Sequence, residues 1–151
     1  MKKRVGGRVV MYDAIDHGLL SGFKWSIVNG YVMGNRNQMR IYMHRLITGA
    51  GPKELVDHVN RNPLDNRASN LRMATPSQNG SNRGPDRRRH GSSSRHKGVS
   101  WSKDRGKWQT SIHINGKTRA LGRFDSELDA ARAYNAAAVE VWGEFARLND
   151  V

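Results

Sequence analysis

Hydrophobic and polar residues alternate over short distances along much of the chain, which predicts short β-strands joined by turns. In residues 23–34, FKWSIVNGYVMG, two apolar segments flank Asn29-Gly30, a pair typical of the tight turn of a hairpin. A third strand is expected through residues 39–47, MRIYMHRLI. Residues 1–21 carry no pattern that decides their role.

Asparagine interrupts the next part of the chain repeatedly. Two short strands are expected near residues 55–59 (LVDHV) and 71–75 (LRMAT), on either side of an asparagine-rich loop. Asparagine side chains hydrogen-bond nearby backbone groups and so stabilise loops that lack a core. The residues placed to do this are Asn60, Asn62, Asn66 and Asn70. Thr75-Pro76-Ser77 then predicts the start of a short helix that runs through Asn79 to Asn82.

Three more strands and a helix are expected in the last third of the chain. The strands are residues 98–101 (GVSW), 107–114 (KWQTSIHI) and 118–124 (TRALGRF), with turns at Arg105-Gly106 and Asn115-Gly116, and the helix runs from Ser126 to about Val141. In the middle strand, one face carries Trp108, Thr110, Ile112 and Ile114, and the other carries Lys107, Gln109, Ser111 and His113. The apolar face suits packing against the helix, whose alanines form a small, flat stripe.

A linker is expected between these two parts. Residues 84–95, GPDRRRHGSSSR, contain no hydrophobic residue and are rich in Gly, Ser and Arg. We therefore predict an N-terminal domain over 1–83, a basic linker over 84–95 and a C-terminal domain over 96–151. Within the C-terminal domain, residues 96–124 are basic and residues 125–151 are acidic, so only its strands should face a polyanion.

Charge and composition narrow the class of partner. The 151 residues carry a formal net charge of +13, which favours DNA, RNA or an anionic surface as the partner. No apolar run approaches the roughly 18 residues of a membrane span, and the start of the chain lacks the apolar stretch of a signal peptide. Cysteine is absent, which excludes disulfides, thiol nucleophiles and Cys-ligated zinc. A cytoplasmic, non-secreted protein that binds nucleic acid is expected, in preference to a merely basic or ribosome-associated one.

The asparagine-rich segment also carries candidate chemistry. A neutral imidazole such as that of His58 can take a proton from water near pH 7. The carboxylate of Asp57 and the amide oxygen of Asn79 are ligands that suit a hard divalent cation. Adjacent strand residues point to opposite faces, so Asp57 and His58 can serve one site only if the strand ends or bulges there.

The segment VDHVNRNPLDNRASNLRMATPSQN, with MHRLI upstream, resembles the core motif of HNH endonucleases of the phage and intron-encoded homing type. The resemblance covers about residues 39–82 and implies a ββα-metal finger. It makes His58 the general base, Asn70 the central asparagine that braces the loop, and Asp57 and Asn79 the metal ligands. The last residue of the motif, Asn79, is Asn rather than His, and the resembling subfamily also has Asn at this position.

The resemblance also implies a reaction. Metal-assisted hydrolysis of a DNA phosphodiester would leave 5′-phosphate and 3′-hydroxyl ends, with Mg²⁺ as the expected ion, Mn²⁺ as a substitute and no zinc. One such site cuts one strand, so a monomer should nick. Contacts to the scissile phosphate are candidates at Arg45 and Arg72, for which a solvated role weighs equally. His44 either positions a phosphate or braces the finger.

The C-terminal segments HKGVSWSKDRGKWQTSIHINGK, LGRFDSELDAARAYNAAA and GEFARLN resemble the DNA-binding domain of plant APETALA and ethylene-response factors. That resemblance implies a three-stranded antiparallel sheet packed on one helix and lying in the DNA major groove. With the finger, the predicted fold class is α+β. The expected DNA contacts here are Lys97, Ser100, Trp101, Lys103, Arg105, Gln109, Ser111, His113 and Arg123, joined by Arg87 and Arg88 of the linker. Gln109, Ser111 and His113 depart from the plant pattern, so the plant target sequence does not carry over.

Three functions are therefore weighed. The first is a metal-dependent homing endonuclease that acts on double-stranded DNA as a monomer or weak dimer, without a small-molecule cofactor, in phage-infected or bacterial cells. The second is a non-enzymatic DNA-binding regulator built on a degenerate nuclease fold. The third is an RNA-binding or ribosome-associated protein.

Overall fold

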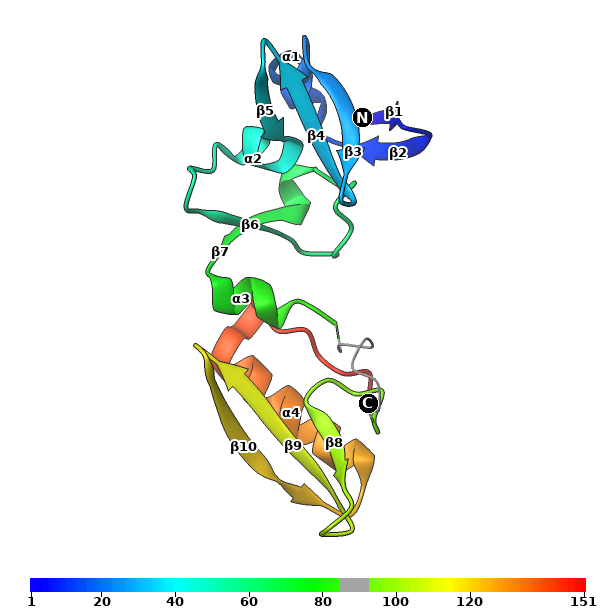
Figure 1. Cartoon of the computed structure of the whole chain (residues 1–151), viewed down its shortest axis with the longest axis vertical. Helices are drawn as coiled ribbons and strands as arrows, with labels where there is room; N and C mark the ends of the chain where they lie inside the picture. The colour runs from blue at the N-terminus through cyan, green and yellow to red at the C-terminus, as the bar shows by residue number, and fades with distance from the viewer. Residues whose placement is uncertain (85–92) are drawn as a thin grey trace. The chain divides into compact units, whose positions relative to one another are not determined.

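The computed structural model describes residues 1–84 and 93–151, which form two compact units. The first unit comprises Met1–Pro76 and the second Ser77–Val151 (Figure 1). Arg87 and Arg88, two of the predicted DNA contacts, lie outside the described residues. Among the helices that are described, none has the length and apolar character needed to cross a membrane.

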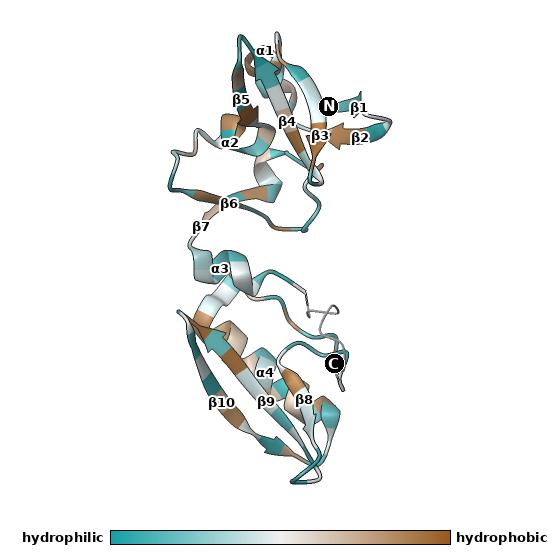
Figure 2. Ribbon diagram, in the orientation of Figure 1, coloured by the Kyte–Doolittle hydropathy of each residue, from teal (hydrophilic) through white to brown (hydrophobic). Residues whose placement is uncertain are grey.

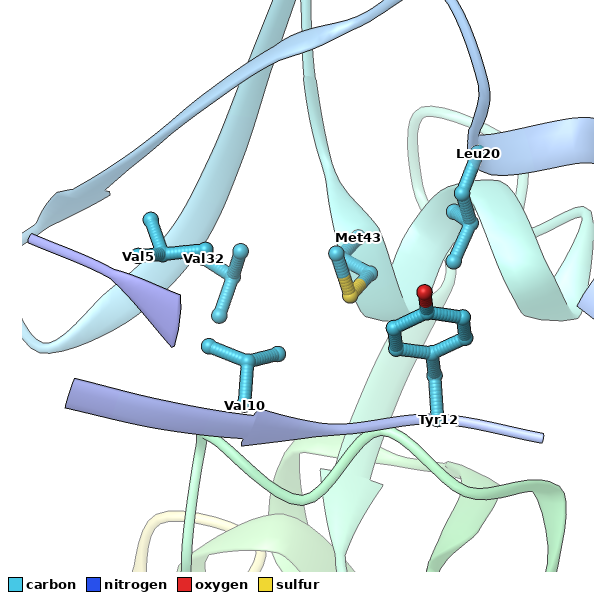
Figure 3. Packing of buried hydrophobic residues seen from close by; sticks show 6 residues of the cluster. All are labelled: Val5, Val10, Tyr12, Leu20, Val32 and Met43. Atoms are coloured by element: carbon cyan, nitrogen blue, oxygen red, sulfur yellow. The ribbon is translucent and has the colours of Figure 1, made fainter. Parts of the chain in front are cut away.

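The first unit is a set of small antiparallel sheets around one core. Its strands are β1 (Lys2–Val5), β2 (Arg8–Met11), β3 (Lys24–Val28), β4 (Tyr31–Arg36), β5 (Met39–Tyr42), β6 (Leu55–His58) and β7 (Leu71–Ala74), and its helices are α1 (His17–Leu20) and α2 (Met43–Thr48). The pairs β1–β2 and β6–β7 are two-stranded sheets, and β3–β4–β5 is a three-stranded sheet. Figure 3 shows Val5, Val10 and Val32 converging with Met43, Tyr12 and Leu20. These side chains fill the core under the sheets.

The predicted hairpin at Asn29-Gly30 is confirmed. Val28 pairs with Tyr31 across the turn, and both turn residues have positive φ, 50° at Asn29 and 86° at Gly30. This combination is the one that Asn-Gly favours, because glycine has no Cβ and asparagine tolerates the left-handed region. The turn places Tyr31 at the start of β4.

The predicted strand over 39–47 is wrong in its second half. β5 ends at Tyr42, and Met43–Thr48 form the helix α2. Met43, Leu46 and Ile47 follow the i, i+3, i+4 spacing of a helix face and all pack in the core. Gly49, with φ 67°, ends the helix in the left-handed conformation. The spacing of a helix was therefore present in the sequence over residues 43–47, directly after the residues that form β5.

The N-terminal residues, whose role the sequence left open, support the asparagine-rich loop. At the end of β2, the Met11 N–H donates to the Leu64 carbonyl at 2.8 Å, and the Asn66 N–H donates to the Met11 carbonyl at 2.7 Å. The carboxylate of Asp13 accepts the Ala68 N–H at 2.7 Å. The first hairpin thus completes the core and fixes the loop that follows β6.

The second unit is a sheet covered by a long helix, preceded by a short one. Its elements are α3 (Pro76–Ser81), β8 (Val99–Ser102), β9 (Lys107–Ile114), β10 (Lys117–Phe124) and α4 (Glu127–Trp142). The strands form an antiparallel sheet in the order β10–β9–β8. The Ser126 hydroxyl accepts the Asp129 N–H at the start of α4, in the manner of a helix N-cap.

The side chains of β9 lie alternately on the two faces of the sheet, as expected. Hydrophobic and hydrophilic residues alternate along the strand (Figure 2). Thr110 and Ile112 are buried, whereas Gln109 and His113 are exposed. Ile112 packs with Tyr134, Ala137 and Ala138 of α4, so the apolar face of the sheet meets the alanine-rich stripe of the helix.

The short helix α3 is held by the second unit. The indole Nε1 of Trp142 donates to the Ser77 hydroxyl at 3.1 Å, and the Ser81 hydroxyl donates to the Phe145 carbonyl at 2.6 Å. The sequence grouped this helix with the N-terminal domain, but its described packing lies with α4. The boundary between compact units falls at Pro76, ahead of the predicted linker.

Candidate active site

The strands β6 and β7 and the loop between them bring the candidate catalytic residues together. Asp57 lies opposite Arg72, and His58 lies opposite Leu71. Both residues lie within β6, of which His58 is the last, and the service of Asp57 and His58 in one site stays a prediction. Both side chains are buried, with 5% of Asp57 and 6% of His58 exposed.

The His58 ring is held by an amide from the loop. Its Nε2 lies 3.4 Å from Oδ1 of Asn66, a fully buried residue. Burial lowers the pKa of His58, and the hydrogen bond to Asn66 and the charges of Asp57 and Asp65 offset only part of that shift. The imidazole is therefore neutral at pH 7, the state in which it can accept a proton.

Asp57 is paired with an arginine from the neighbouring strand. Its Oδ2 accepts a hydrogen bond from Arg72 Nε at 3.0 Å and lies 2.9 Å from Nη2. The two residues are direct cross-strand partners, so the pair fixes the orientation of the carboxylate. Arg72, a candidate phosphate contact, is thus engaged with the candidate metal ligand.

The asparagine-rich loop is organised by side chains rather than by apolar packing. Asn70 Oδ1 accepts the Asn60 N–H at 2.8 Å, and Asn70 Nδ2 donates to the Asp65 carbonyl at 2.7 Å. Asn70 thereby connects both sides of the loop. Asn62 Oδ1 accepts the Leu64 N–H at 3.1 Å, which closes a local turn.

Asp65 is a structural residue that the sequence did not single out. It is completely buried and accepts hydrogen bonds from Arg67 Nε at 2.8 Å, Arg67 Nη2 at 2.6 Å and Asn60 Nδ2 at 2.8 Å. The hydrogen bond from Arg67 lowers the pKa of this carboxyl, against the opposing effect of burial. The signal in the sequence was the single acid of the asparagine-rich loop, two residues before an arginine.

The rings of His44 and Tyr31 contact His58, and Tyr42 joins the cluster through His44; the two tyrosines were not foreseen. His44 on α2 lies edge-on to His58, with ring centroids 5.1 Å apart, and stacks on Tyr42 at 5.5 Å. Tyr31, at the start of β4, lies 5.6 Å from His44 and 6.0 Å from His58. The hairpin, α2 and β6 therefore all contribute to one cluster, which brings His44 to the candidate site.

Arg45, the other candidate phosphate contact, supports a loop. Its guanidinium donates to the carbonyls of Glu54 at 2.8 Å, Ala50 at 3.3 Å and Gly51. These contacts fix the segment between α2 and β6. In this arrangement the side chain stabilises the approach to β6.

Acid should destabilise the protein through His44. Burial, together with the charges of His58 and Arg45, lowers the pKa of His44 to about 4 from 6.5. Between these values the unfolded chain binds a proton that the folded chain does not, so stability is lost as pH falls from about 6.5 to 4. His44→Phe should lower by about one the number of protons that the chain takes up on unfolding in this pH range, so its stability should depend less on pH. Urea unfolding of both proteins at pH 7, 5.5 and 4.5 checks it, and parallel pH dependences would contradict it.

Asn79, the second predicted metal ligand, is half-buried on α3 in the second unit. Among residues 1–84 and 93–151, no group of three or more His, Cys, Asp or Glu side chains is placed to hold a metal ion. A site of the predicted kind needs no such group, since its protein ligands are one carboxylate and one amide. Water and phosphate oxygens would complete the coordination.

The predicted DNA contacts on the C-terminal sheet fall into distinct groups. Ser100 pairs with Gln109, and Arg123 also pairs with Gln109, so these three share the polar face of the sheet. Ser111 and His113 follow on the same face of β9. Lys103 and Arg105 are exposed in the turn between β8 and β9.

Two predicted contacts have described partners within the second unit. Trp101 pairs with Trp108, with ring centroids 5.1 Å apart, and 38% of Trp101 is exposed. Its contact with DNA stays a prediction. Lys97 is half-buried, and its ammonium donates to the carbonyls of Ser81 and of Arg83, at 2.9 Å for the latter. Lys97 thus holds the end of α3.

Comparison with known proteins agrees with the site. A family model described as HNH endonuclease matches residues 42–81. The chain is 33% identical over 139 residues to an uncharacterized HNH endonuclease of Acanthamoeba polyphaga mimivirus, an alignment that covers 88% of this chain and 70% of that protein. It is 34% identical over 92 residues to protein 3.8 of Escherichia phage T7, covering 61% of this chain and 73% of that protein.

A third relative matches a smaller share of its own length. It is an AP2-like ethylene-responsive transcription factor of Arabidopsis thaliana, 41% identical over 81 residues, or 52% of this chain and 16% of that protein. No solved structure matches the chain significantly. The match to the family model covers β6, β7 and α3, and the viral relative extends over most of the chain. This chain therefore belongs to the HNH endonuclease family.

Proposed function

We propose that this protein is a metal-dependent DNA endonuclease of the homing type that nicks one strand per site, with the target DNA bound by its C-terminal sheet. The observation that carries the proposal is His58: a buried, neutral imidazole at the end of β6, fixed by Asn66 and next to the carboxylate of Asp57. An isolated structural histidine would not need a neighbouring carboxylate held in place by an arginine.

The hydrogen bond between His58 Nε2 and Asn66 Oδ1 supports a division of roles between the two ring nitrogens. An amide oxygen accepts, so Nε2 carries the proton and the lone pair of the neutral ring is on Nδ1. Nδ1 would take a proton from the water that attacks phosphorus. General base catalysis of this kind contributes about 10²–10⁴-fold to a rate. Asn70 acts indirectly, by keeping the loop that carries Asn66 closed.

The available oxygens suit a hard divalent cation. Asp57 and Asn79 would hold it, and Arg72 orients the Asp57 carboxylate. When bound, Mg²⁺ supplies charge stabilisation to the phosphate and the leaving 3′ oxygen. Mn²⁺ has similar preferences for oxygen ligands and should substitute.

The polar face of the C-terminal sheet supports DNA binding. Arg123 and Gln109 lie together on it, and Lys103 and Arg105 project from the adjacent turn. Exposed arginine and lysine attract phosphates, and glutamine can pair with a base edge. Joining this surface to a cutting site raises the effective concentration of DNA at the site.

Removing divalent metal should abolish cleavage but not binding. Supercoiled plasmid incubated with the protein and Mg²⁺ is expected to convert to nicked circles with 5′-phosphate ends, while EDTA stops the conversion and Mn²⁺ restores it. Gel electrophoresis measures cleavage, and a mobility shift in EDTA measures binding. Binding without cleavage in either metal would favour the non-enzymatic regulator. Preference for structured RNA at fixed salt would favour the RNA-binding alternative.

A further inference from the structure

His44 is a buried polar residue whose nitrogens the fold does not use. Only 8% of the residue is exposed, and its Nδ1 is buried with no hydrogen-bond partner in residues 1–84 and 93–151. An unsatisfied buried polar atom is destabilising, because it loses its hydrogen bonds to water without gaining a partner in the fold. Phenylalanine would make similar ring contacts to Tyr42 and His58 without that cost. The imidazole therefore calls for an explanation beyond packing.

The two nitrogens of His44 differ in their access to solvent. Nδ1 is buried without a hydrogen-bond partner in the described part of the chain, whereas Nε2 is not buried in this way. A buried N–H without a partner is rarer than an unpaired acceptor, so the favoured tautomer has the lone pair on Nδ1 and the proton on Nε2. His44 then offers one N–H donor and no accessible lone pair.

The charge state of His44 fits a donor and not a base. Its pKa of about 4 keeps the ring neutral at pH 7, through burial and the nearby charges of His58 and Arg45. A proton-accepting role would need the sealed Nδ1. Two neighbouring histidines thus have different chemistry available: His58 can accept a proton, and His44 can only donate a hydrogen bond.

The other candidates for phosphate contact at this site are engaged. Arg45 donates to three backbone carbonyls, and Arg72 is paired with Asp57. The His44 ring, by contrast, has its Nδ1 without a hydrogen-bond partner among the described residues, and its centroid lies 5.1 Å from that of His58. A phosphate close enough for a water activated by His58 is also close to the His44 ring.

We propose that His44 is a second catalytic histidine, whose neutral Nε2–H donates a hydrogen bond to a non-bridging oxygen of the scissile phosphate while His58 acts as the base. The proposal rests on the proposed nuclease function. This role explains why the position holds an imidazole although a phenyl ring would pack there. The hydrogen bond would stabilise the negative charge that builds up on the phosphate oxygen as water attacks phosphorus.

Kinetics of three variants test this role. His44→Phe keeps the ring and removes the donor, so it should lower kcat for nicking about 10²-fold with DNA affinity unchanged within about two-fold. His44→Gln supplies an amide N–H and should recover part of the loss. His17→Phe is the matched control, since His17 is bonded to Tyr12 away from the cluster, and it should cleave at the wild-type rate. Thermal unfolding should show His44→Phe folded and no less stable than wild type.

A His44→Phe rate within two-fold of wild type would overturn the proposal while leaving the nuclease function intact. Absence of nicking by the wild type would overturn both. A second measurement does not need cleavage: long-range ¹H–¹⁵N NMR of the metal-free protein at pH 7 reports the tautomer of each histidine. Protonated Nε2 on His44 is expected, and a proton on Nδ1 would overturn the proposal.

Discussion

Replacing His58 with alanine is expected to reduce the rate of Mg²⁺-dependent nicking by about 10²–10⁴-fold, because the substitution removes the proposed general base. His44 does not replace it in the proposed arrangement, since its Nδ1 is buried in the aromatic cluster. DNA affinity should change less than about two-fold, because the predicted DNA contacts lie on the C-terminal sheet. Single-turnover cleavage of a nicking substrate measures the rate, and a mobility shift measures affinity.

His17→Ala serves as the control for His58→Ala. His17 is in the same unit and hydrogen-bonds Tyr12 at 3.2 Å, outside the cluster around His58. It should leave the cleavage rate unchanged. Nicking by His58→Ala at the wild-type rate would remove the general base from the proposed reaction. Loss of cleavage together with an altered circular dichroism spectrum would instead assign His58 a role in folding.

Asp65→Ala is expected to destabilise the first unit by roughly 2–4 kcal/mol. The substitution removes the acceptor of three hydrogen bonds, from both Arg67 donors and from Asn60. It leaves the Asn60 amide without its partner in a buried loop, and the Asn70 bridge depends on the same loop. Cleavage at 37 °C should fall because the Asn66 amide that orients His58 is carried by this segment.

Asp125→Ala is the matched control for Asp65→Ala. Asp125 also forms an ion pair, with Lys107, but its side chain is 86% exposed, so its loss should cost less than about 1 kcal/mol. Urea unfolding followed by circular dichroism gives both values. Equal effects of the two substitutions would show that the buried loop network contributes no more than a surface pair.

The elements with strong local signals could be read from the sequence. Asn29-Gly30 specifies its own turn geometry, and the helix after Ser126 has both an N-cap and a continuous alanine stripe. The family was also recognisable, because its motif is local and contiguous. The helix α2 was missed because the strand-like residues Met39–Tyr42 precede it directly, and its helical spacing spans only five residues.

Only the part of the site whose residues are close together in the sequence could be predicted. Asp57 and His58 are adjacent in one motif, whereas Tyr31 reaches His58 from β4 and His44 reaches it from α2. Tyr42, at the end of β5, joins the cluster by stacking on His44. Their role depends on tertiary packing, which no local pattern encodes. Similarly, the register that places Trp101 opposite Trp108, and the capping of α3 by Lys97, depend on pairings between distant residues. The assignment of the metal ligands and of the DNA contacts stays a prediction.

The anchoring of α3 has a consequence for protein engineering. Joining a foreign C-terminal domain within residues 84–95 would discard Trp142 and Phe145, whose indole and backbone carbonyl bond Ser77 and Ser81 of the helix. The helix has only six residues, too few to persist in water unaided. A chimera made at that junction would therefore lose the support of the helix that carries Asn79, and a working replacement must supply its own indole and backbone acceptor.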